Sequence, residues 1–310
     1  MKSPSLDRRL FVTASLAAAG AMGVFGYPVA AWAEARRIVS LGGAATEILY
    51  ALGAGDRIAA VDVSSRFPSA ARAKPNVGYY RSLSAEGVLA LGPDLVVATD
   101  GAGPKEAIDV LKGASVGLLQ LDEATSGADV AARMRRVAGA VGEAARGEAA
   151  ARRIEEDAAA LEASLSKVAR RRRAIVLLGP PRGGALMAAG AGSSGAHALA
   201  LSGADNAAAA LSGWKPLTDE AAYAMEPDAI VVLATSAPVS PDEIARHPAF
   251  AGSPAVKENR VVSADALGFI GFGPRVAHAA RAVAAGIYPE AAIPDLPERD
   301  WTVDRDVAAR

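Results

Sequence analysis

The chain of 310 residues has no cysteine, only three histidines and few aromatic residues. The absence of cysteine excludes disulfide bonds, thiolate metal sites, iron–sulfur clusters, cysteine nucleophiles and an acylated lipoprotein anchor. Three histidines argue against a histidine-rich zinc or copper site. The 33 basic side chains nearly balance the 34 acidic ones, which argues against a nucleic-acid-binding protein, because such proteins are usually basic overall or in one region.

Enzyme signatures are isolated matches or are missing from the sequence. Residues 190–195 match the G-x-G-x-x-G pattern, but no strand is expected directly before them, as a dinucleotide-binding loop requires, and Gly42-Gly43 fits neither this pattern nor the Walker pattern. The G-x-S-x-G match at residues 113–117 lies between an expected helix and an expected strand, not in the strand–turn–helix order of a nucleophile elbow, and no two histidines have the spacing of zinc ligands. The sequence therefore predicts a protein that is not an enzyme.

The first 33 residues have the features of an export signal. Arg8-Arg9 resembles a Tat signal, and it precedes an apolar run that ends in an Ala-Trp-Ala tripeptide at Ala33. The alternative is a membrane anchor, because Leu10 to Ala33 is long enough to span a bilayer. We expect cleavage near Ala33 to leave a slightly acidic protein in the periplasm.

The rest of the sequence alternates short β-branched runs with amphipathic segments. Strands are expected at residues 37–41, 57–61, 95–98, 116–121, 174–178, 229–233 and 260–262. Helices are expected at residues 47–52, 84–91, 105–111, 128–141, 196–201 and 274–287. This alternation predicts an α/β protein with parallel strands and helical crossovers.

A long helical segment divides this pattern into two halves. Residues 144–173 contain no proline, and their acidic residues come early while a basic cluster, Arg170 to Arg173, comes last, an order that suits a helix dipole. The predicted organisation is an export signal, an N-terminal lobe, a connecting helix, a C-terminal lobe and a charged tail. Their ranges are 1–33, 36–143, 144–173, 174–289 and 290–310.

A repeated stretch relates the two lobes. In each copy a hydroxyl residue, Ser84 or Thr218, precedes by two positions a glutamate, Glu86 or Glu220, and a Pro-Asp turn then leads into an apolar strand. We expect the hydroxyls to cap short helices and the glutamates to interact favourably with the helix dipoles. Two related lobes predict a cleft between them, and such clefts commonly bind ligands.

Four stretches resemble the periplasmic haemin-binding proteins of bacterial ABC importers. They are RIVSLGGAATEILYALGAGDRIAAVD, VGYYRSLSAEGVLALGPDLVV, PLTDEAAYAMEPDAIVV and LGFIGFGPR. The resemblance covers residues 36–289 and implies two Rossmann-like lobes joined by one long helix. It also implies a monomeric carrier of haem b that delivers its cargo to an inner-membrane permease dimer with its ATPase. Cobalamin and ferric-siderophore binders belong to the same helical-backbone class of solute-binding proteins.

The resemblance also implies a ligand for the haem iron. In the family, the tyrosine of a V-G-Y-x-R-x-L-S-A-E-G stretch is the axial ligand of ferric haem, and that position is Tyr79 here. Phenolate is a hard anionic donor that suits ferric iron, and tyrosine is a known haem ligand. Arg81 could favour the phenolate or pair with a haem propionate. Tyr80, at the variable position of the stretch, is the local competitor.

Other residues complete the expected site. Arg275 could meet a propionate, and Met187, Trp214 and Phe272 could form apolar cleft wall or core. The resemblance further implies that Glu86 and Glu220, one on each lobe, dock onto arginines of the permease; the alternative is that they only stabilise their helices.

The sequence departs from the family at two loops. Some members have a histidine for a second haem where this chain has Arg182, and some have an arginine where this chain has residues 234–237. These departures argue against a second bound haem. The alternatives to a haem carrier are a cobalamin or ferric-siderophore binder, or a membrane-tethered enzyme or sensor module on the same fold.

Overall fold

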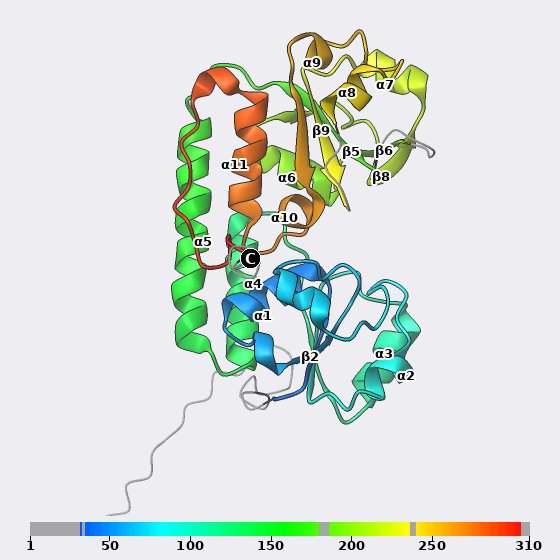
Figure 1. Cartoon of the computed structure of the whole chain (residues 1–310), viewed down its shortest axis with the longest axis vertical. Helices are drawn as coiled ribbons and strands as arrows, with labels where there is room; N and C mark the ends of the chain where they lie inside the picture. The colour runs from blue at the N-terminus through cyan, green and yellow to red at the C-terminus, as the bar shows by residue number, and fades with distance from the viewer. Residues whose placement is uncertain (1–31, 33–34, 180–185, 236–239, 305–310) are drawn as a thin grey trace, which may run out of the picture.

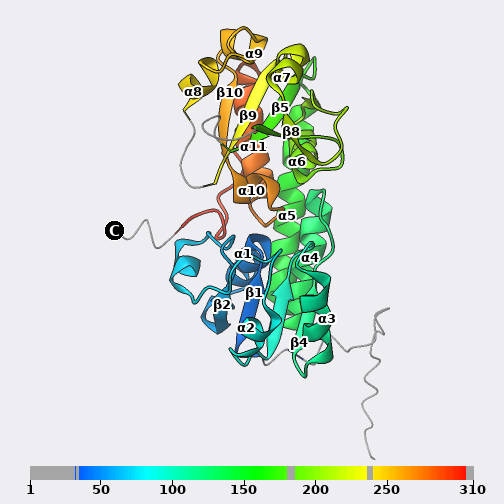
Figure 2. The same cartoon turned by 90° about the vertical axis from the view of Figure 1, so that its right-hand side faces the viewer.

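A computed structural model describes residues 32, 35–179, 186–235 and 240–304. Two α/β lobes lie one above the other, and a long helix, α5 (Ala144–Leu165), runs along one side of both (Figures 1 and 2). In the described part of the chain, no helix combines the length and apolar character needed to cross a membrane. The predicted export signal lies outside the described residues, apart from Trp32.

The N-terminal lobe contains a parallel four-stranded sheet in the order β2-β1-β3-β4. Its strands are β1 (Ile38–Leu41), β2 (Ile58–Val61), β3 (Leu95–Ala98) and β4 (Gly117–Gln120). Its helices are α1 (Gly43–Ala51), α2 (Ala85–Leu89), α3 (Lys105–Gly113) and α4 (Gly127–Ala140), with short turns η2 (Gly55–Arg57) and η3 (Ser69–Ala73). The two central strands are fully buried, as parallel strands covered on both faces should be.

The C-terminal lobe contains a mixed sheet in the order β10-β9-β5-β6-β8, with β7 beside β5. Its strands are β5 (Arg173–Leu178), β6 (Leu186–Ala189), β7 (Asp205–Asn206), β8 (Trp214–Leu217), β9 (Ala229–Ala234) and β10 (Val261–Asp265). Its helices are α6 (Ser194–Leu201), α7 (Asp219–Met225), α8 (Pro241–Ala245), α9 (Pro254–Lys257), α10 (Ala266–Ile270) and α11 (Val276–Ile287), followed by a turn, η4 (Pro289–Ala291). The predicted parallel α/β fold is confirmed, but β6 and β8 extend the sheet with antiparallel pairs that the sequence pattern did not indicate.

The repeated stretch forms the same local structure in both lobes. The Ser84 hydroxyl accepts a hydrogen bond from the Gly87 N–H at 3.1 Å at the start of α2. The Thr218 hydroxyl accepts one from the Ala221 N–H at 3.3 Å at the start of α7. Both hydroxyls therefore satisfy an N–H group that would otherwise lack a partner in the first helical turn.

The connecting helix ends at Leu165, before the basic cluster predicted to close it. Arg173 begins β5, and the other three arginines of this cluster lie in the link before it and form ion pairs with acidic residues of the C-terminal half of the chain. These pairs are Arg170–Asp228, Arg171–Asp205 and Arg172–Glu290. The basic residues that were expected to end the helix thus attach the link to the C-terminal half of the chain.

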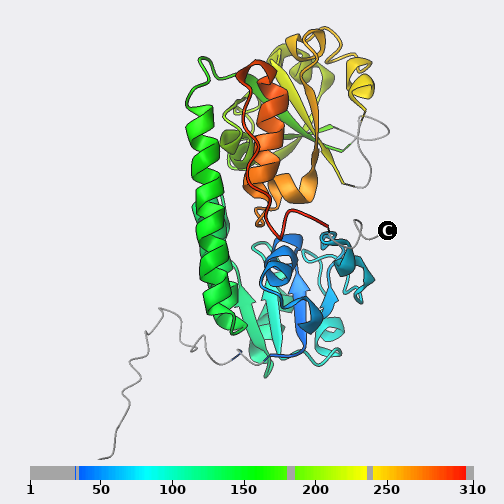
Figure 3. The same ribbon diagram turned by 60° about the vertical axis from the view of Figure 1, so that its left-hand side comes forward.

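Residues 290–304 form a C-terminal strap that packs beside α11 and α5 (Figure 3). The Trp301 side chain is buried, and its indole N–H donates to the Pro274 carbonyl at 3.1 Å. Arg299 forms an ion pair with the buried carboxylate of Asp157 on α5. The segment predicted to be an irregular tail has little regular structure, but it is held against the C-terminal lobe and the connecting helix.

The end of the strap also reaches the N-terminal lobe. The Asp304 carboxylate accepts hydrogen bonds from the Ser69 N–H and hydroxyl at 2.9 and 2.8 Å, at the start of η3. A single hydrophobic core cluster also includes residues of α1, α4, α5 and α11 and so continues from one lobe to the other. The lobes are therefore joined by a shared core and by the strap, as well as by α5.

Candidate functional site

A cleft of about 610 Å³ lies between the two lobes, within the roughly 300–1,000 Å³ typical of ligand pockets. Its walls come mainly from loops at the carboxyl ends of parallel strands, the usual place for ligand sites in α/β sheets, with Arg133 added from α4 and Trp214 from β8. The N-terminal wall contains mainly aromatic, polar and charged side chains. They are Val63, Ser64, Arg66, Tyr79, Tyr80, Arg81, Thr99, Asp100, Glu123 and Arg133.

The C-terminal wall is mainly apolar. It consists of Leu178, Trp214, Ala234, Ala266, Leu267, Ile270 and Phe272, with Ser194, Thr235 and Asp265 as its polar members. Among the expected wall residues, Trp214 and Phe272 line the cleft, whereas the half-buried Met187 of β6 does not. The loop position of Arg182 and residues 236–237 lie outside the described residues.

The tyrosine loop, residues 76–81, is fixed by hydrogen bonds on both sides. The Val63 N–H donates to the Gly78 carbonyl at 2.9 Å, and the Gly103 N–H donates to the Tyr80 carbonyl at 2.9 Å. Gly78 has a φ of 89°, which residues with a side chain rarely adopt. Backbone contacts with two neighbouring loops therefore place the tyrosines in the cleft wall.

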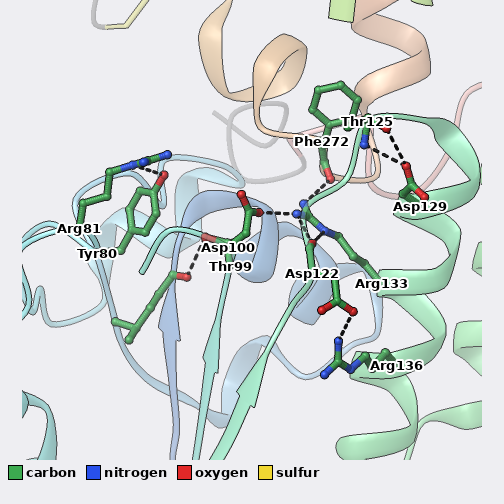
Figure 4. Close-up of polar contacts among 11 residues, drawn as sticks. Tyr80, Arg81, Thr99, Asp100, Asp122, Thr125, Asp129, Arg133, Arg136 and Phe272 are labelled. Atoms are coloured by element: carbon green, nitrogen blue, oxygen red, sulfur yellow. Dashed lines mark hydrogen bonds and ion pairs between the residues drawn. The ribbon is translucent and has the colours of Figure 1, made fainter. Parts of the chain in front are cut away.

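The two tyrosines differ in their environment. Their rings lie edge to face with centroids 5.0 Å apart. The Tyr79 side chain is 43% exposed, and its hydroxyl has no hydrogen-bond partner among the described residues. Tyr80 instead accepts a hydrogen bond from Arg81 Nε at 2.9 Å (Figure 4). Tyr79 is thus the tyrosine whose oxygen is available to a ligand.

Burial raises the pKa of the Tyr80 hydroxyl above its ordinary value, and the positive charge of Arg81 offsets this only in part. Tyr80 therefore stays protonated at neutral pH, since tyrosine already has a pKa of about 10 in water. The sequence could not tell which tyrosine Arg81 would contact. The structure pairs it with Tyr80 rather than with the predicted iron ligand.

The floor of the cleft contains an arginine that the sequence analysis missed. Arg133 of α4 has a side chain only 5% exposed, and it forms an ion pair with Asp100 after β3 (Figure 4). Its other nitrogens donate to the Asp122 carbonyl at 2.8 Å and, across the lobes, to the Phe272 carbonyl at 3.3 Å. The sequence did contain a signal for this residue, because Arg133 lies on the same helix face as the apolar Val130. An arginine on a buried helix face needs a buried partner.

Asp62 organises the loops of the N-terminal wall and was also missed. Its buried carboxylate accepts hydrogen bonds from the Gly42 N–H at 3.0 Å and from the Ser64 N–H at 3.1 Å. It also accepts from the hydroxyls of Ser64 at 3.0 Å and Ser65 at 2.8 Å. One carboxylate thus connects the loops after β1 and β2, which both contribute to the cleft.

Arg275 lies in a contact between the lobes and is not among the cleft-lining residues. Its guanidinium is 2.5 Å from the carboxylate of Glu47 on α1 and 3.2 Å from Asp265, and it stacks over the Phe67 ring at 3.8 Å. Burial raises the pKa of Glu47, against the opposing effect of the Arg275 charge. The arginine expected at a propionate thus already has two carboxylate partners.

Glu86 and Glu220 are exposed in the first turns of α2 and α7. Glu86 accepts a hydrogen bond from the Ser84 hydroxyl at 3.1 Å. Hydrogen bonds from its own N–H and from Thr218 lower the pKa of Glu220, so it is charged at neutral pH. Both helices lie on the side of the molecule away from α5, one on each lobe (Figure 1).

Histidines and clustered carboxylates do not supply a metal site in the described part of the chain. No group of three or more such residues is placed to hold an ion there, and no histidine lines the cleft. A metal that enters the cleft would therefore meet oxygen donors on its described walls. Tyr79 is the exposed one of the two tyrosines there.

Comparisons with known proteins agree with the two-lobed architecture. A family model described as periplasmic binding protein matches residues 38–267. The periplasmic haem-binding protein RhuT from Roseiflexus sp. RS-1 has a TM-score of 0.75 and 32% identity, covering 83% of this chain and 99% of that one. A periplasmic haem-binding protein from Pseudomonas aeruginosa has a TM-score of 0.73 and 30% identity, covering 83% and 94%.

Two further proteins are also similar to this chain. An ABC transporter substrate-binding lipoprotein of Bacillus subtilis is 28% identical over 259 residues, which are 83% of this chain and 81% of that protein. The vitamin B12-binding protein BtuF of Vibrio cholerae has a TM-score of 0.71 at 22% identity, covering 82% of this chain and 97% of that one. The second likeness concerns the fold alone.

Proposed function

We propose that this chain, which belongs to the periplasmic binding protein family, captures haem between its lobes and delivers it to an inner-membrane ABC importer. The observation that carries the proposal is the exposed Tyr79 in the interlobe cleft, whose hydroxyl has no hydrogen-bond partner among the described residues. The likeness to haem-binding proteins of 30 and 32% identity supports the same ligand.

Tyr79 suits ferric haem better than Tyr80 does. Ferric iron prefers an anionic oxygen donor, and tyrosine is a known axial ligand of haem. Tyr80 is kept neutral by burial, and its oxygen already accepts a hydrogen bond from Arg81. Ligation by Tyr79 would bring iron next to that pair, and Arg81 would then stand close to the new phenolate.

The two walls suit the two parts of the haem molecule. Trp214, Ile270 and Phe272 of the C-terminal wall offer apolar surface to a porphyrin face. The N-terminal wall supplies the oxygen ligand and guanidinium groups for the propionates. The cleft therefore combines a predominantly apolar surface with a few polar groups, as ligand pockets typically do.

Delivery would use the exposed glutamates of the repeated stretch. Glu86 and Glu220 occupy equivalent first-turn positions on the two lobes. A dimeric permease offers two related surfaces, and one carboxylate per lobe would match a pair of cationic sites on them. The likeness to an ABC transporter substrate-binding lipoprotein supports this partner.

Ligand titration tests the proposal. The protein without residues 1–33 is titrated with haemin, cyanocobalamin and a ferric hydroxamate siderophore, and binding is followed by absorbance and tryptophan fluorescence. We expect one haemin to bind and shift its Soret band, while the other two ligands leave both signals unchanged. Tighter binding of cobalamin or the siderophore than of haemin would replace haem as the cargo.

A further inference from the structure

The arginines that line the cleft differ in the side-chain partners that they already have. Arg133 is neutralised by Asp100 and is nearly fully buried. Arg81 donates a hydrogen bond to the hydroxyl of Tyr80, which is neutral, so the positive charge of Arg81 is not cancelled by that contact. Arg66 lines the same cleft but has no ion pair or side-chain hydrogen bond within the described residues.

The backbone at Arg66 is nevertheless fixed. Its N–H donates to the Ser64 carbonyl at 2.9 Å, and its carbonyl accepts from Arg72 Nε at 3.0 Å. The same turn is joined to the tyrosine loop by the hydrogen bond from Val63 to Gly78 at 2.9 Å. Arg66 lies shortly after Val63 in the sequence, and Tyr79 directly follows Gly78. Both residues are therefore close in sequence to this hydrogen bond. The backbone of Arg66 is therefore fixed on the wall that carries the proposed iron ligand, and its guanidinium has no partner among the described residues.

The carboxylates that line the cleft form no ion pair with Arg66 within the described residues. Asp100 is paired with Arg133, and Asp265 contacts Arg275 at 3.2 Å and caps α10. Glu123 is the remaining carboxylate among the lining residues, and it is exposed to solvent. The lining carboxylates equal the lining arginines in number, but none of them pairs with Arg66 or Arg81, so these two guanidiniums remain available to an anionic group.

We infer that Arg66 binds a propionate of the haem and so determines how the porphyrin is oriented in the cleft. The inference rests on the proposed function. The phenolate of Tyr79 would neutralise the single positive charge of a ferric porphyrin, which leaves the two propionates unbalanced. Arg66 and Arg81 are the guanidiniums of the described cleft walls without a carboxylate partner. A guanidinium can hold a carboxylate through two parallel hydrogen bonds.

The test compares two porphyrins that differ only at the propionates. Wild type, Arg66→Ala and Lys74→Ala are titrated with haemin and with haemin dimethyl ester, in which both propionates are esterified. Lys74→Ala is the matched control, because it removes a positive charge from the same lobe at a residue that does not line the cleft. Thermal melting of all three proteins checks that each is folded.

We expect Arg66→Ala to weaken haemin binding by about tenfold, a usual effect of losing a hydrogen bond to a charged group. Its affinity for the dimethyl ester should equal that of wild type, and Lys74→Ala should match wild type with both ligands. Equal haemin affinity in Arg66→Ala and wild type, or an equal loss with both porphyrins, would overturn the inference but leave the proposed function intact. Wild type that binds neither porphyrin would overturn both.

Discussion

The N-terminal and C-terminal walls of the cleft are built alike but differ in chemistry. Each wall is formed mainly by loops at the carboxyl ends of parallel strands. The N-terminal wall contains two tyrosines and three arginines, whereas the described C-terminal wall contains mostly aliphatic and aromatic side chains. One lobe therefore presents hydroxyl, carboxylate and guanidinium groups to the cleft, and the other presents mainly apolar surface.

Contacts between the lobes fix the position of one wall relative to the other. Arg133 links the floor to the Phe272 carbonyl, Glu47 pairs with Arg275, and Asp304 of the strap contacts Ser69. These contacts connect the lobes at several places besides α5. We expect them to limit closure of the cleft, so that release of the cargo depends on docking to the importer.

The largest expected effect is on haem transport. It concerns Glu86 and Glu220, which occupy equivalent positions on the outer surfaces of the two lobes. A protein carrying both Glu86→Ala and Glu220→Ala should lose nearly all haem transport in reconstituted vesicles, more than about a hundredfold, because both of the proposed charge pairs with the permease would be lost. Its haemin affinity should equal that of wild type.

The single variants sharpen this comparison of the lobes. Each should lose transport to a similar extent, and Glu106→Ala, which removes an exposed glutamate of α3, should transport normally. Normal transport by the double variant would show that the repeated glutamates only stabilise their helices.

The next effect concerns the strap that joins the lobes. Trp301→Ala should lower the free energy of unfolding by about 3 kcal/mol, because truncation of a buried aromatic side chain leaves a cavity. Urea denaturation measures this loss. Tyr223→Ala is the control, since Tyr223 is 66% exposed and its loss should change stability by less than about 0.5 kcal/mol. Equal stability of the two variants would mean that the strap does not pack as described.

A smaller effect is expected at the apolar wall. Trp214→Ala should weaken haemin binding by about tenfold, or about 1.4 kcal/mol, without changing the absorption spectrum, because packing surface is lost while the iron ligand stays. Met187→Ala is the matched control from the adjacent strand, outside the cleft, and should bind haemin normally. A changed iron spectrum in Trp214→Ala would contradict the division of roles between the walls.

The smallest effect concerns the pH dependence of the contact between the lobes. Burial raises the pKa of Glu47 above its ordinary value of 4.5, although the Arg275 charge opposes the shift. The folded protein therefore binds this proton more tightly than the unfolded chain does. The stabilisation is fully present below the unfolded pKa and is lost as pH rises through the folded pKa.

Glu47→Gln cannot titrate, so it should lack this part of the pH dependence. Wild type should lose stability relative to the variant as pH rises above the ordinary glutamate pKa of 4.5, as measured by urea denaturation at each pH. Glu106→Gln, on an exposed face, should run parallel to wild type. A constant difference between wild type and Glu47→Gln would contradict the raised pKa.

Local patterns in the sequence predicted much of the fold. Short β-branched runs and capped helices identified the parallel strands, and the repeated stretch identified the caps at Ser84 and Thr218. These features depend on neighbouring residues, so the sequence alone contains their signal. The antiparallel pairing of β6 with β8 was missed, because both strands are short and β8 contains Lys215 and Pro216, which do not suggest a sheet interior.

The polar partners in the site could not be predicted in the same way. The ion pair of Arg275 with Glu47 and the hydrogen bond of Arg133 to Phe272 join segments far apart in the chain. The contact of Arg81 with Tyr80 rather than Tyr79 depends on how one short loop is turned. The motif thus identified the loop, while the role of each side chain depended on tertiary contacts.

The central claim is that the N-terminal wall supplies the iron ligand through Tyr79. The most direct measurement is the absorption and electron paramagnetic resonance spectrum of the ferric haem complex in wild type, Tyr79→Phe and Tyr80→Phe. We predict that Tyr79→Phe loses the signature of phenolate ligation and that Tyr80→Phe keeps it. An unchanged spectrum in Tyr79→Phe, or loss of the signature only in Tyr80→Phe, would contradict the account.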